Sequence, residues 1–302
     1  MLNISSDQDL ALSPAIGFSD PLHVYFLVGM SGRESRKALF RLLSRREILD
    51  NVLASDIVFE ILDARIPEYL RNRFLERVAM NNGKRLVLVL NKSDLVPRSV
   101  ISEWINYYRD RGLECIATSA STGDIRAVKR ILREAGREIM ASFFGAPKVG
   151  KSSLVNTLKG KKSATVSRYP GTPGYTKGIQ VYRIYRNVYI IDTPGSLPID
   201  ADRLEMIIRT RPPEKIENPL GIAIELIERI ERIMPGSIER AYGVSGKPLE
   251  ILEVLAIKRG WILRGSGEPN IEEAAREIIR SYLDGRIRFY TKPDHMDIIS
   301  KA

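Results

Sequence analysis

The sequence contains very little cysteine and histidine. Its 302 residues include one Cys, Cys115, and two His, His23 and His295. A single cysteine excludes an internal disulfide framework and is typical of a reducing compartment, and so few thiol and imidazole groups argue against a metal cluster. Residues 1–20 carry three acids and no Lys or Arg, so the charged start of a signal peptide is absent. We therefore expect a cytoplasmic protein.

Long apolar runs are also missing. No stretch approaches the ~20 apolar residues that cross a bilayer, although hydrophobic residues make up 44% and charged residues 28% of the chain. These fractions are ordinary for a globular protein. The length predicts two domains, because single hydrophobic cores stop growing at about 250–300 residues. A membrane-spanning protein is excluded, and we expect no membrane partner.

Acidic residues are scarce in one part of the chain. The net charge is +10, yet from Ala201 to the end there are 17 basic and 17 acidic residues, so the excess lies in the first 200. Between Gly145 and Gly195 there are nine basic residues and one acid, Asp192. So basic a segment commonly faces the phosphates of a nucleotide or a nucleic acid. Outside the motifs described below, a solvated lysine-rich surface is the alternative.

The hydrophobic pattern predicts an α/β domain with a mainly parallel sheet, followed by a small all-α domain. The predicted strands are Ile57–Leu62, Arg85–Leu90, Leu113–Thr118, Met140–Phe144, Ile179–Tyr185 and Val188–Ile191. The predicted helices are Glu34–Asn51, Tyr69–Asn81, Val100–Arg111, Gly123–Glu138 and Ser152–Leu158, then Leu204–Ile208, Ile222–Ile233, Leu249–Ile257 and Ile271–Leu283. The expected domains are 1–50, an N-terminal arm with a basic helix, 51–200, the sheet domain, and 201–302, the helical domain.

The segment 145–152, GAPKVGKS, fits the eight-residue phosphate-binding loop. It lies between a predicted strand and a predicted helix, where backbone N–H groups and the helix dipole favour anions. Lys151 is predicted to reach the β- and γ-phosphates, and the Ser152 hydroxyl to bind Mg²⁺. The residues assigned to the phosphates are Pro147, Lys148, Val149, Gly150, Lys151, Ser152 and Ser153.

A second metal-side motif follows about 40 residues later. Ile190 to Gly195, IIDTPG, is an apolar strand ending in Asp and Gly. We expect Asp192 to hold Mg²⁺ through water and the Gly195 N–H to sense the γ-phosphate. A switch threonine is needed as well, and Thr176 is favoured over Thr172 because it directly precedes a strand. The catalytic assignment is therefore Lys151, Thr176 and Gly195, and the metal assignment Ser152, Thr176 and Asp192.

Two short motifs at strand ends predict a guanine site. In Asn91-Lys92-Ser93-Asp94, the carboxylate of Asp94 can accept both N1–H and the 2-amino group of guanine, a donor pair that adenine lacks. Asn91 is expected to brace the loops and the stem of Lys92 to cover the base. Ser119 and Ala120 would supply backbone N–H to the guanine O6. Ligands of α/β sheets bind at the carboxyl ends of the strands, which favours this assignment.

The order of these motifs is reversed, since the base-reading motifs precede the phosphate loop. In this the sequence resembles the circularly permuted GTPases of the YlqF/YawG class, the RbgA-like ribosome-assembly factors, which are P-loop NTPases with a permuted Ras-like G domain. Asp63-Ala64-Arg65-Ile66-Pro67 is similar to their Asp-Ala-Arg-x-Pro signature, and Tyr282–Ile287 to the end of their helical domain. From the residues alone, Asp63 and Arg65 could be functional or a buried pair that holds a loop.

The resemblance implies a GTPase switch that binds GTP, GDP and Mg²⁺ and acts on a large ribosomal subunit precursor. We expect a monomer with ribosomal RNA as its partner. The residues predicted to contact RNA are Lys159, Lys161, Lys162, Arg168, Lys177, Arg286 and Arg288.

Three departures from the resemblance concern hydrolysis. Ser196 stands where Ras-like enzymes carry a water-orienting Gln and where the resembled family, which also lacks that Gln, usually has a hydrophobic residue. The N-terminal His motif of bacterial relatives is absent. Potassium-responsive relatives have Asn at the position of Lys148, and we hypothesise that the Lys148 ammonium replaces the cation. A slow intrinsic rate is therefore expected. A GTP-binding RNA scaffold with negligible hydrolysis is the alternative.

Overall fold

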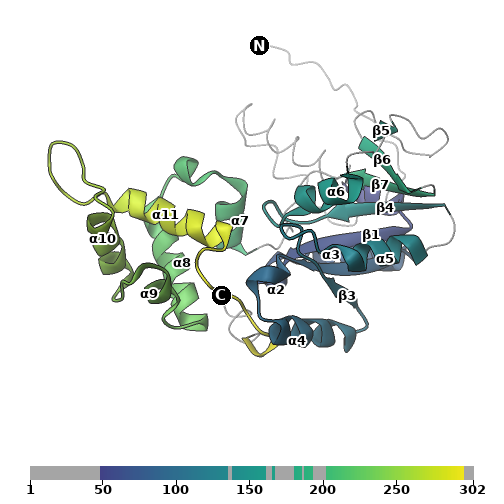
Figure 1. Ribbon diagram of the computed structural model, residues 1–302, viewed down its shortest axis with the longest axis horizontal. Coiled ribbons are helices and arrows are strands. Elements are labelled where there is room, and N and C mark those ends of the chain that lie inside the picture. Colours follow the sequence, from purple (N-terminus) through teal and green to yellow (C-terminus); the bar gives the residue numbers. More distant parts are fainter. Residues whose placement is uncertain are drawn as a thin grey trace, which may run out of the picture. The chain divides into compact units, whose positions relative to one another are not determined.

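The computed structural model describes residues 48–134, 138–160, 165–166, 180–185, 187–192 and 202–295. The described strands form a seven-stranded sheet in the order β3-β2-β1-β4-β7-β6-β5 (Figure 1). They are β1 (Ile57–Asp63), β2 (Arg85–Asn91), β3 (Glu114–Ala117), β4 (Ile139–Phe144), β5 (Thr165–Val166), β6 (Gln180–Tyr185) and β7 (Val188–Asp192). Neighbours from β3 to β7 are parallel, whereas β6 pairs antiparallel with both β7 and β5. The predicted mainly parallel sheet is confirmed.

Helices alternate with the parallel strands and then continue without strands. The helices of the sheet region are α2 (Pro67–Leu70), α3 (Arg73–Asn81), α4 (Arg98–Arg109), α5 (Arg126–Glu134) and α6 (Lys151–Lys159). Those that follow are α7 (Arg203–Thr210), α8 (Pro219–Ile233), α9 (Ser237–Tyr242), α10 (Pro248–Lys258) and α11 (Ile271–Asp284). Arg45–Ala302 form one compact unit. The predicted domain boundary at 200/201 and the predicted arm up to residue 47 lie outside the described residues, and both stay predictions.

The predicted helix Tyr69–Asn81 is wrong in one respect, because it is two helices. Arg71 is extended at the break, with ψ 134°, and Asn72 caps α3 by accepting a hydrogen bond from the Leu75 N–H. The Arg71 guanidinium forms ion pairs with Glu68 and Glu76 on either side of the break. The chain therefore turns where Asn offers a cap and Arg joins the two helices.

The C-terminal segment after α11 returns to the sheet region. Thr291 donates its backbone N–H to the carbonyl of Arg65 at 2.7 Å, and its own carbonyl accepts from the Trp104 indole at 2.9 Å. Trp104 and Thr291 are both fully buried. In the part of the chain that the structure describes, no helix is long and apolar enough to cross a membrane.

Glu60 lies in the middle of β1, a strand whose seven residues are all buried. One carboxylate oxygen accepts the Asn72 N–H at 2.5 Å, and the Glu76 carboxyl group lies beside Glu60. Burial raises the pKa of Glu60 well above its usual value, and the nearby Glu76 carboxylate raises the pKa further. The native state therefore holds a proton on Glu60 over a pH range where the unfolded chain has lost it.

We expect Glu60→Gln to remove a pH dependence of stability. Because the folded pKa of Glu60 is raised, its contribution is fully present below the unfolded pKa of about 4.3 and is lost as pH rises towards the folded pKa, by up to about 1.4 kcal/mol per pH unit. Glutamine keeps the acceptor for Asn72 and carries no charge. Urea unfolding of both proteins from pH 4 to 9 would measure the pH dependence of their unfolding free energies. Parallel profiles for the two proteins would contradict a raised pKa of Glu60.

Candidate nucleotide-binding site

The predicted base-reading and phosphate-binding motifs lie at the carboxyl ends of the parallel strands. Asp63, the last residue of β1, is paired with Asn91, the last residue of β2, and Leu90 with Ala117 at the end of β3. On the other side of β1, β4 ends at Phe144 immediately before the phosphate-binding loop. Because all these strands are parallel, their carboxyl ends bring the base-reading and phosphate-binding loops together.

Asn91 joins three of these loops through its side-chain amide. The Nδ2 group donates to the Val149 carbonyl of the phosphate-binding loop at 2.8 Å. The Oδ1 atom accepts from the Thr118 hydroxyl at 3.2 Å and from the Ala120 N–H at 3.1 Å. Asn91 is buried, and its amide therefore holds the loops that carry Asp94, Ala120 and Lys151 in one place.

The phosphate-binding loop has a backbone conformation that requires glycine at one position. Gly150 has φ +90°, and a Cβ there would collide with the Asn91 amide nitrogen. Lys151 begins α6 and is buried, whereas Ser152 and Ser153 are exposed in its first turn. Their backbone N–H groups are in the first turn of a helix, which is an anion-binding arrangement.

Asp94 lies beside the Ser–Ala motif, as a guanine selector would. One carboxylate oxygen accepts from the Ser119 hydroxyl at 2.6 Å and the other from Ser121 at 3.3 Å. Asp94 is exposed, while Ser119 is buried. The carboxylate is thus oriented by two hydroxyl groups at the surface of the site.

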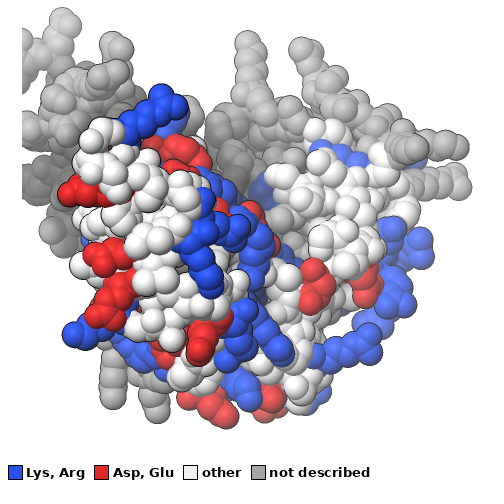
Figure 2. All heavy atoms as spheres, turned by 60° about the vertical axis from the view of Figure 1, so that its left-hand side comes forward, with Lys and Arg blue, Asp and Glu red and all other residues white. Residues whose placement is uncertain are grey.

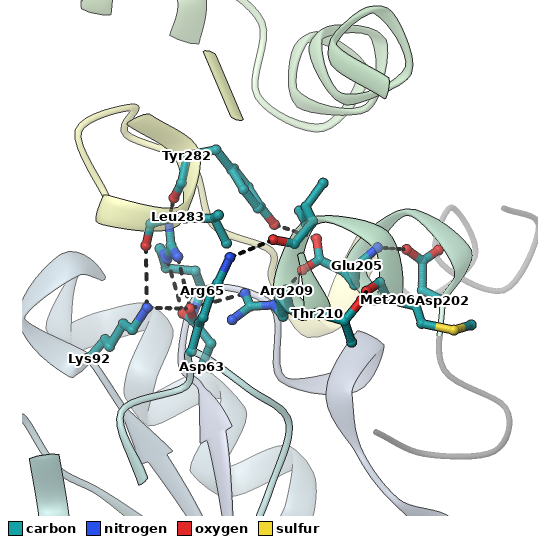
Figure 3. Close-up of polar contacts among 12 residues, drawn as sticks. Asp63, Arg65, Lys92, Asp202, Glu205, Met206, Arg209, Thr210, Tyr282 and Leu283 are labelled. Carbon is teal, nitrogen blue, oxygen red and sulfur yellow. Dashed lines mark hydrogen bonds and ion pairs between the residues drawn. The ribbon is translucent and has the colours of Figure 1, made fainter. Parts of the chain in front are cut away.

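Lys92 turns its ammonium towards a buried charge cluster rather than into solvent (Figure 3). The ammonium lies 3.2 Å from the Asp63 carboxylate and donates to the Leu283 carbonyl of α11 at 3.4 Å. Burial lowers the pKa of Lys92, although the Asp63 carboxylate opposes that shift. The predicted cover of the base by the Lys92 stem stays a prediction.

Asp63 and Arg65 form a buried ion pair, the structural alternative that the sequence left open. The guanidinium lies 2.8 Å from the carboxylate, and the two side chains are 1% and 0% exposed. Arg65 also donates to the Tyr282 carbonyl at 2.6 Å. Burial alone would raise the pKa of Asp63, but Arg65, Lys92 and Arg209 together lower it well below its usual value.

Arg209 of α7 completes this charge cluster and was missed in the sequence. Its guanidinium lies 3.2 Å from Asp63 and 2.6 Å from Glu205, and all three side chains are fully buried. Glu205 in turn accepts from the Tyr282 hydroxyl at 2.6 Å. The cluster (Asp63, Arg65, Lys92, Glu205, Arg209 and Tyr282, Figure 3) therefore ties the first and second parallel strands to α7 and α11.

Lys148 of the phosphate-binding loop also contacts α7. Its ammonium donates to the carbonyls of Ile208 and Arg211 at 2.9 and 3.0 Å, at the carboxyl end of the helix. A cation is favoured there by the helix dipole. Its backbone has φ 62°. To replace a monovalent cation at the phosphates, as hypothesised, the ammonium would leave these two carbonyls.

The residues predicted to contact RNA are only partly described. Lys159 lies over the Tyr182 ring at 3.2 Å from its centroid. Arg286 is half-exposed and pairs with Glu277 at 2.7 Å and Asp284 at 3.3 Å, while Arg288 is exposed. Lys161, Lys162, Arg168 and Lys177 lie outside the described residues.

The predicted switch region likewise lies outside the described residues. It comprises Thr172, Thr176, Gly195, Ser196 and the side chain of Asp192. The backbone of Asp192 is paired with Phe143 of β4, so β7 delivers it to the same sheet edge. Among the described residues, no group of three or more His, Cys, Asp or Glu side chains is placed to hold a metal ion.

Comparison with known proteins gives consistent matches. The family model of the RsgA GTPase matches residues 33–201. "Uncharacterized GTP-binding protein MJ1464" of Methanocaldococcus jannaschii is 35% identical over 78% of the chain and 63% of its own length. Nucleolar GTP-binding protein 2 of Cryptococcus neoformans is 31% identical over 94% of the chain but 42% of its own length. The chain thus spans between about two fifths and just under two thirds of these relatives.

A solved structure matches most of the chain. GNP-bound YlqF from T. maritima is 26% identical, with a TM-score of 0.62 over 83% of this chain and 98% of that one. The GDP-bound YlqF structure matches with the same TM-score, at 25% identity. The predicted fold is confirmed: it is the P-loop GTPase fold in its circularly permuted form.

Proposed function

Because the chain belongs to the RsgA GTPase family, we propose that it is a GTP-binding switch that hydrolyses GTP to GDP and phosphate during assembly of the large ribosomal subunit. The hydrogen bond from Asn91 to Val149 carries this proposal, since it holds the base-reading loop against the phosphate loop. Loops at the carboxyl ends of neighbouring parallel strands are where α/β sheets bind nucleotides, so the two loops would hold the base and the phosphates of one guanosine nucleotide.

The base end of the site would select guanine. Asp94 would exchange its contacts with Ser119 and Ser121 for the N1–H and 2-amino group of the base. The Ala120 N–H would exchange the Asn91 Oδ1 atom for O6, and the Ser119 N–H would exchange the Asp124 carbonyl for it. Adenine offers an acceptor at N1 and no 2-amino group, so the Asp94 carboxylate would be left unpaired beside it.

The phosphate end would hold Mg²⁺ as well as the nucleotide. Ser152 is exposed in the first turn of α6, and β7 ends at Asp192 beside β4. A hydroxyl and a carboxylate are hard oxygen donors of the type that Mg²⁺ binds. Ser152, Asp192 and Thr176 would hold the ion, which neutralises charge on the β- and γ-phosphates when bound. Lys151 would add its positive charge, and the Gly195 N–H would contact the γ-phosphate.

Hydrolysis by this chain alone is proposed to be slow. Ser196 occupies the position after Gly195 and is too short to orient a water molecule as a Gln does there. The alternative of a GTP-binding RNA scaffold with negligible hydrolysis also starts from Ser196. Phosphate release with and without large ribosomal subunits separates the two, because stimulated release supports the switch and none under either condition supports the scaffold.

An RNA partner fits the distribution of charge. Figure 2 shows Lys and Arg side chains gathered in a band through the middle of the face that it presents, with acidic residues on both sides. Basic bands of this kind bind phosphate backbones, with affinities that fall steeply with salt. Location in the cytoplasm and a monomeric state belong to the same proposal.

Association with ribosomal particles tests the proposed function directly. The full chain would be sedimented with large-subunit precursors in the presence of GTP, of a non-hydrolysable GTP analogue, or of GDP. Tighter association with the triphosphates than with GDP is expected of a switch. Equal association in all three states, or none, would overturn the proposal.

Potassium is expected not to stimulate hydrolysis. The Lys148 ammonium, which donates to the Ile208 and Arg211 carbonyls in the structure, is proposed to turn to the phosphates when nucleotide binds. An added monovalent cation would then be redundant there. We expect equal rates of phosphate release in KCl and NaCl, and a potassium-dependent rate for Lys148→Asn. Strong stimulation of the unaltered protein by KCl would rule this role out.

A further inference from the structure

Helix α5 presents a basic face that the sequence motifs do not account for. Arg126, Lys129, Arg130 and Arg133 follow each other at spacings of three, one and three residues, which puts them on one side of the helix. The apolar residues of α5 lie on the other side and are buried in the core. We call Arg126, Lys129, Arg130 and Arg133 the α5 basic face.

The α5 basic face is accessible and hollowed. The side chains of Arg126 and Arg130 are 89% and 69% exposed. With Glu134, the four basic residues line an open hollow of about 300 Å³. Asp124 and Glu134 form exposed ion pairs with Arg126 and Arg130, and such pairs are worth only ~0–1 kcal/mol. A polyanion can therefore displace the two carboxylates.

Aromatic rings extend the α5 basic face towards α6. The Arg133 guanidinium lies over the Tyr185 ring, 5.3 Å from its centroid. On the same strand, the Tyr182 ring lies under the Lys159 ammonium. Both rings are thus covered by cations on one side and cannot stack a base there. The surface consequently offers positive charge to a backbone and not a platform to bases.

We propose that the α5 basic face binds the phosphate backbone of RNA, without reading its sequence. A membrane surface is disfavoured because a membrane-binding helix inserts its apolar side, and that of α5 is packed in the core. A protein partner is disfavoured because no large hydrophobic residue of α5 is exposed, whereas protein interfaces have an apolar centre. The choice of RNA over other polyanions rests on the proposed function.

The test uses the full chain and a fluorescein-labelled RNA duplex of about 20 base pairs. The variant carries Arg126→Gln, Lys129→Gln and Arg130→Gln, and it keeps Arg133, which contacts the Tyr185 ring. The matched control carries Arg98→Gln, Lys215→Gln and Arg232→Gln, which removes the same charge from exposed residues elsewhere. Fluorescence anisotropy would be measured over a salt series, and thermal unfolding would show that all three proteins fold.

The α5 variant is expected to bind the duplex at least about tenfold more weakly near 0.1 M salt, with a log–log salt slope reduced by about 2–3, since each phosphate contact contributes about 0.9. The control should lose little of either. Equal effects in the two variants would overturn the proposal, as would loss of binding to phosphatidylserine vesicles with RNA binding retained.

The two proposals can fail separately. If the α5 variant no longer binds the duplex while the unaltered chain does not bind large-subunit precursors, the RNA surface is supported and the ribosomal role is wrong. If the unaltered chain binds those precursors more tightly with GTP than with GDP, and the α5 variant binds the duplex as its control does, the proposed switch is supported and the proposed RNA surface is wrong. Guanine-nucleotide affinity should be the same in all three proteins, because α5 lies outside the nucleotide loops.

Discussion

Replacing Asp94 with Asn is expected to lower the affinity for GTP by about 100-fold or more and to favour xanthosine triphosphate instead. The carboxylate would accept two hydrogen bonds from guanine, and hydrogen bonds to a charged group contribute ~1.5–3 kcal/mol each. The asparagine amide would instead face the 2-amino group with a second donor. Xanthine carries a carbonyl at that position, and the amide nitrogen can donate to it.

Calorimetry with GTP, ATP and xanthosine triphosphate would measure the change in base preference. Asp110→Asn is the matched control, because Asp110 is an exposed residue at the end of α4 and makes the same chemical change away from the loops. In the structure Ser119 and Ser121 already orient the Asp94 carboxylate. If Asp94→Asn and Asp110→Asn bound the three nucleotides alike, Asp94 would not read the base.

Replacing Arg209 with Met is expected to cost about 3–5 kcal/mol of unfolding free energy. The guanidinium lies between Asp63 and Glu205, all fully buried, and removing one partner of a buried ion cluster leaves uncompensated charge behind. Arg65 and Lys92 still compensate Asp63, whereas Glu205 keeps the more distant Arg229 guanidinium at 3.8 Å. Glu205 should therefore suffer the larger loss. The sheet region and α7 share this cluster, and both should become easier to unfold.

Arg203→Met is the control on the same helix. Arg203 pairs with Glu225, but the two side chains are 71% and 41% exposed, so the loss should stay within about 1 kcal/mol. Urea unfolding of both variants would give the two free energies, and equal losses would contradict the cluster's role.

The cost of Arg209→Met should also shrink in acid. The lowered pKa of Asp63 means that its contribution is present above the unfolded pKa of about 3.9 and disappears as pH falls through the folded pKa. Once the Asp63 carboxylate is protonated, loss of the guanidinium leaves less charge unpaired. The decrease is expected below the unfolded pKa of about 3.9. A cost that stayed constant down to the lowest pH at which both proteins fold would speak against an electrostatic cause.

Much of the sheet region follows from local patterns. Strand β2 is a continuous apolar run from Leu86 to Leu90, and β1 is an apolar run interrupted by Glu60. A parallel sheet buried on both faces produces such runs. The break between α2 and α3 was missed because Tyr69–Asn81 keeps a helical period across Arg71. Helix α9 was missed as well, because its six residues, Ser237–Tyr242, are too few to show one.

In the candidate site, too, the sequence identified the residues that belong to local motifs and missed those that distant segments bring together. The loop motifs around Asp94 and Lys151 have local spacing, so they could be assigned from the chain alone. The sequence left Asp63 and Arg65 open between two roles, since a strand end suits both. Nothing near Arg209 marked it as a partner of Asp63, because 146 residues separate the two in the sequence.

The order of motifs along the chain by itself determined the circularly permuted GTPase fold, because loop spacing and strand periodicity are local properties. Tertiary structure alone decided that Lys92 and Lys148, both from nucleotide motifs, turn their ammonium groups to α11 and α7. A charged group is stabilised by whichever opposite charge or carbonyl oxygen the fold brings within about 3 Å. That neighbour is a matter of packing between distant segments, and no local pattern encodes it.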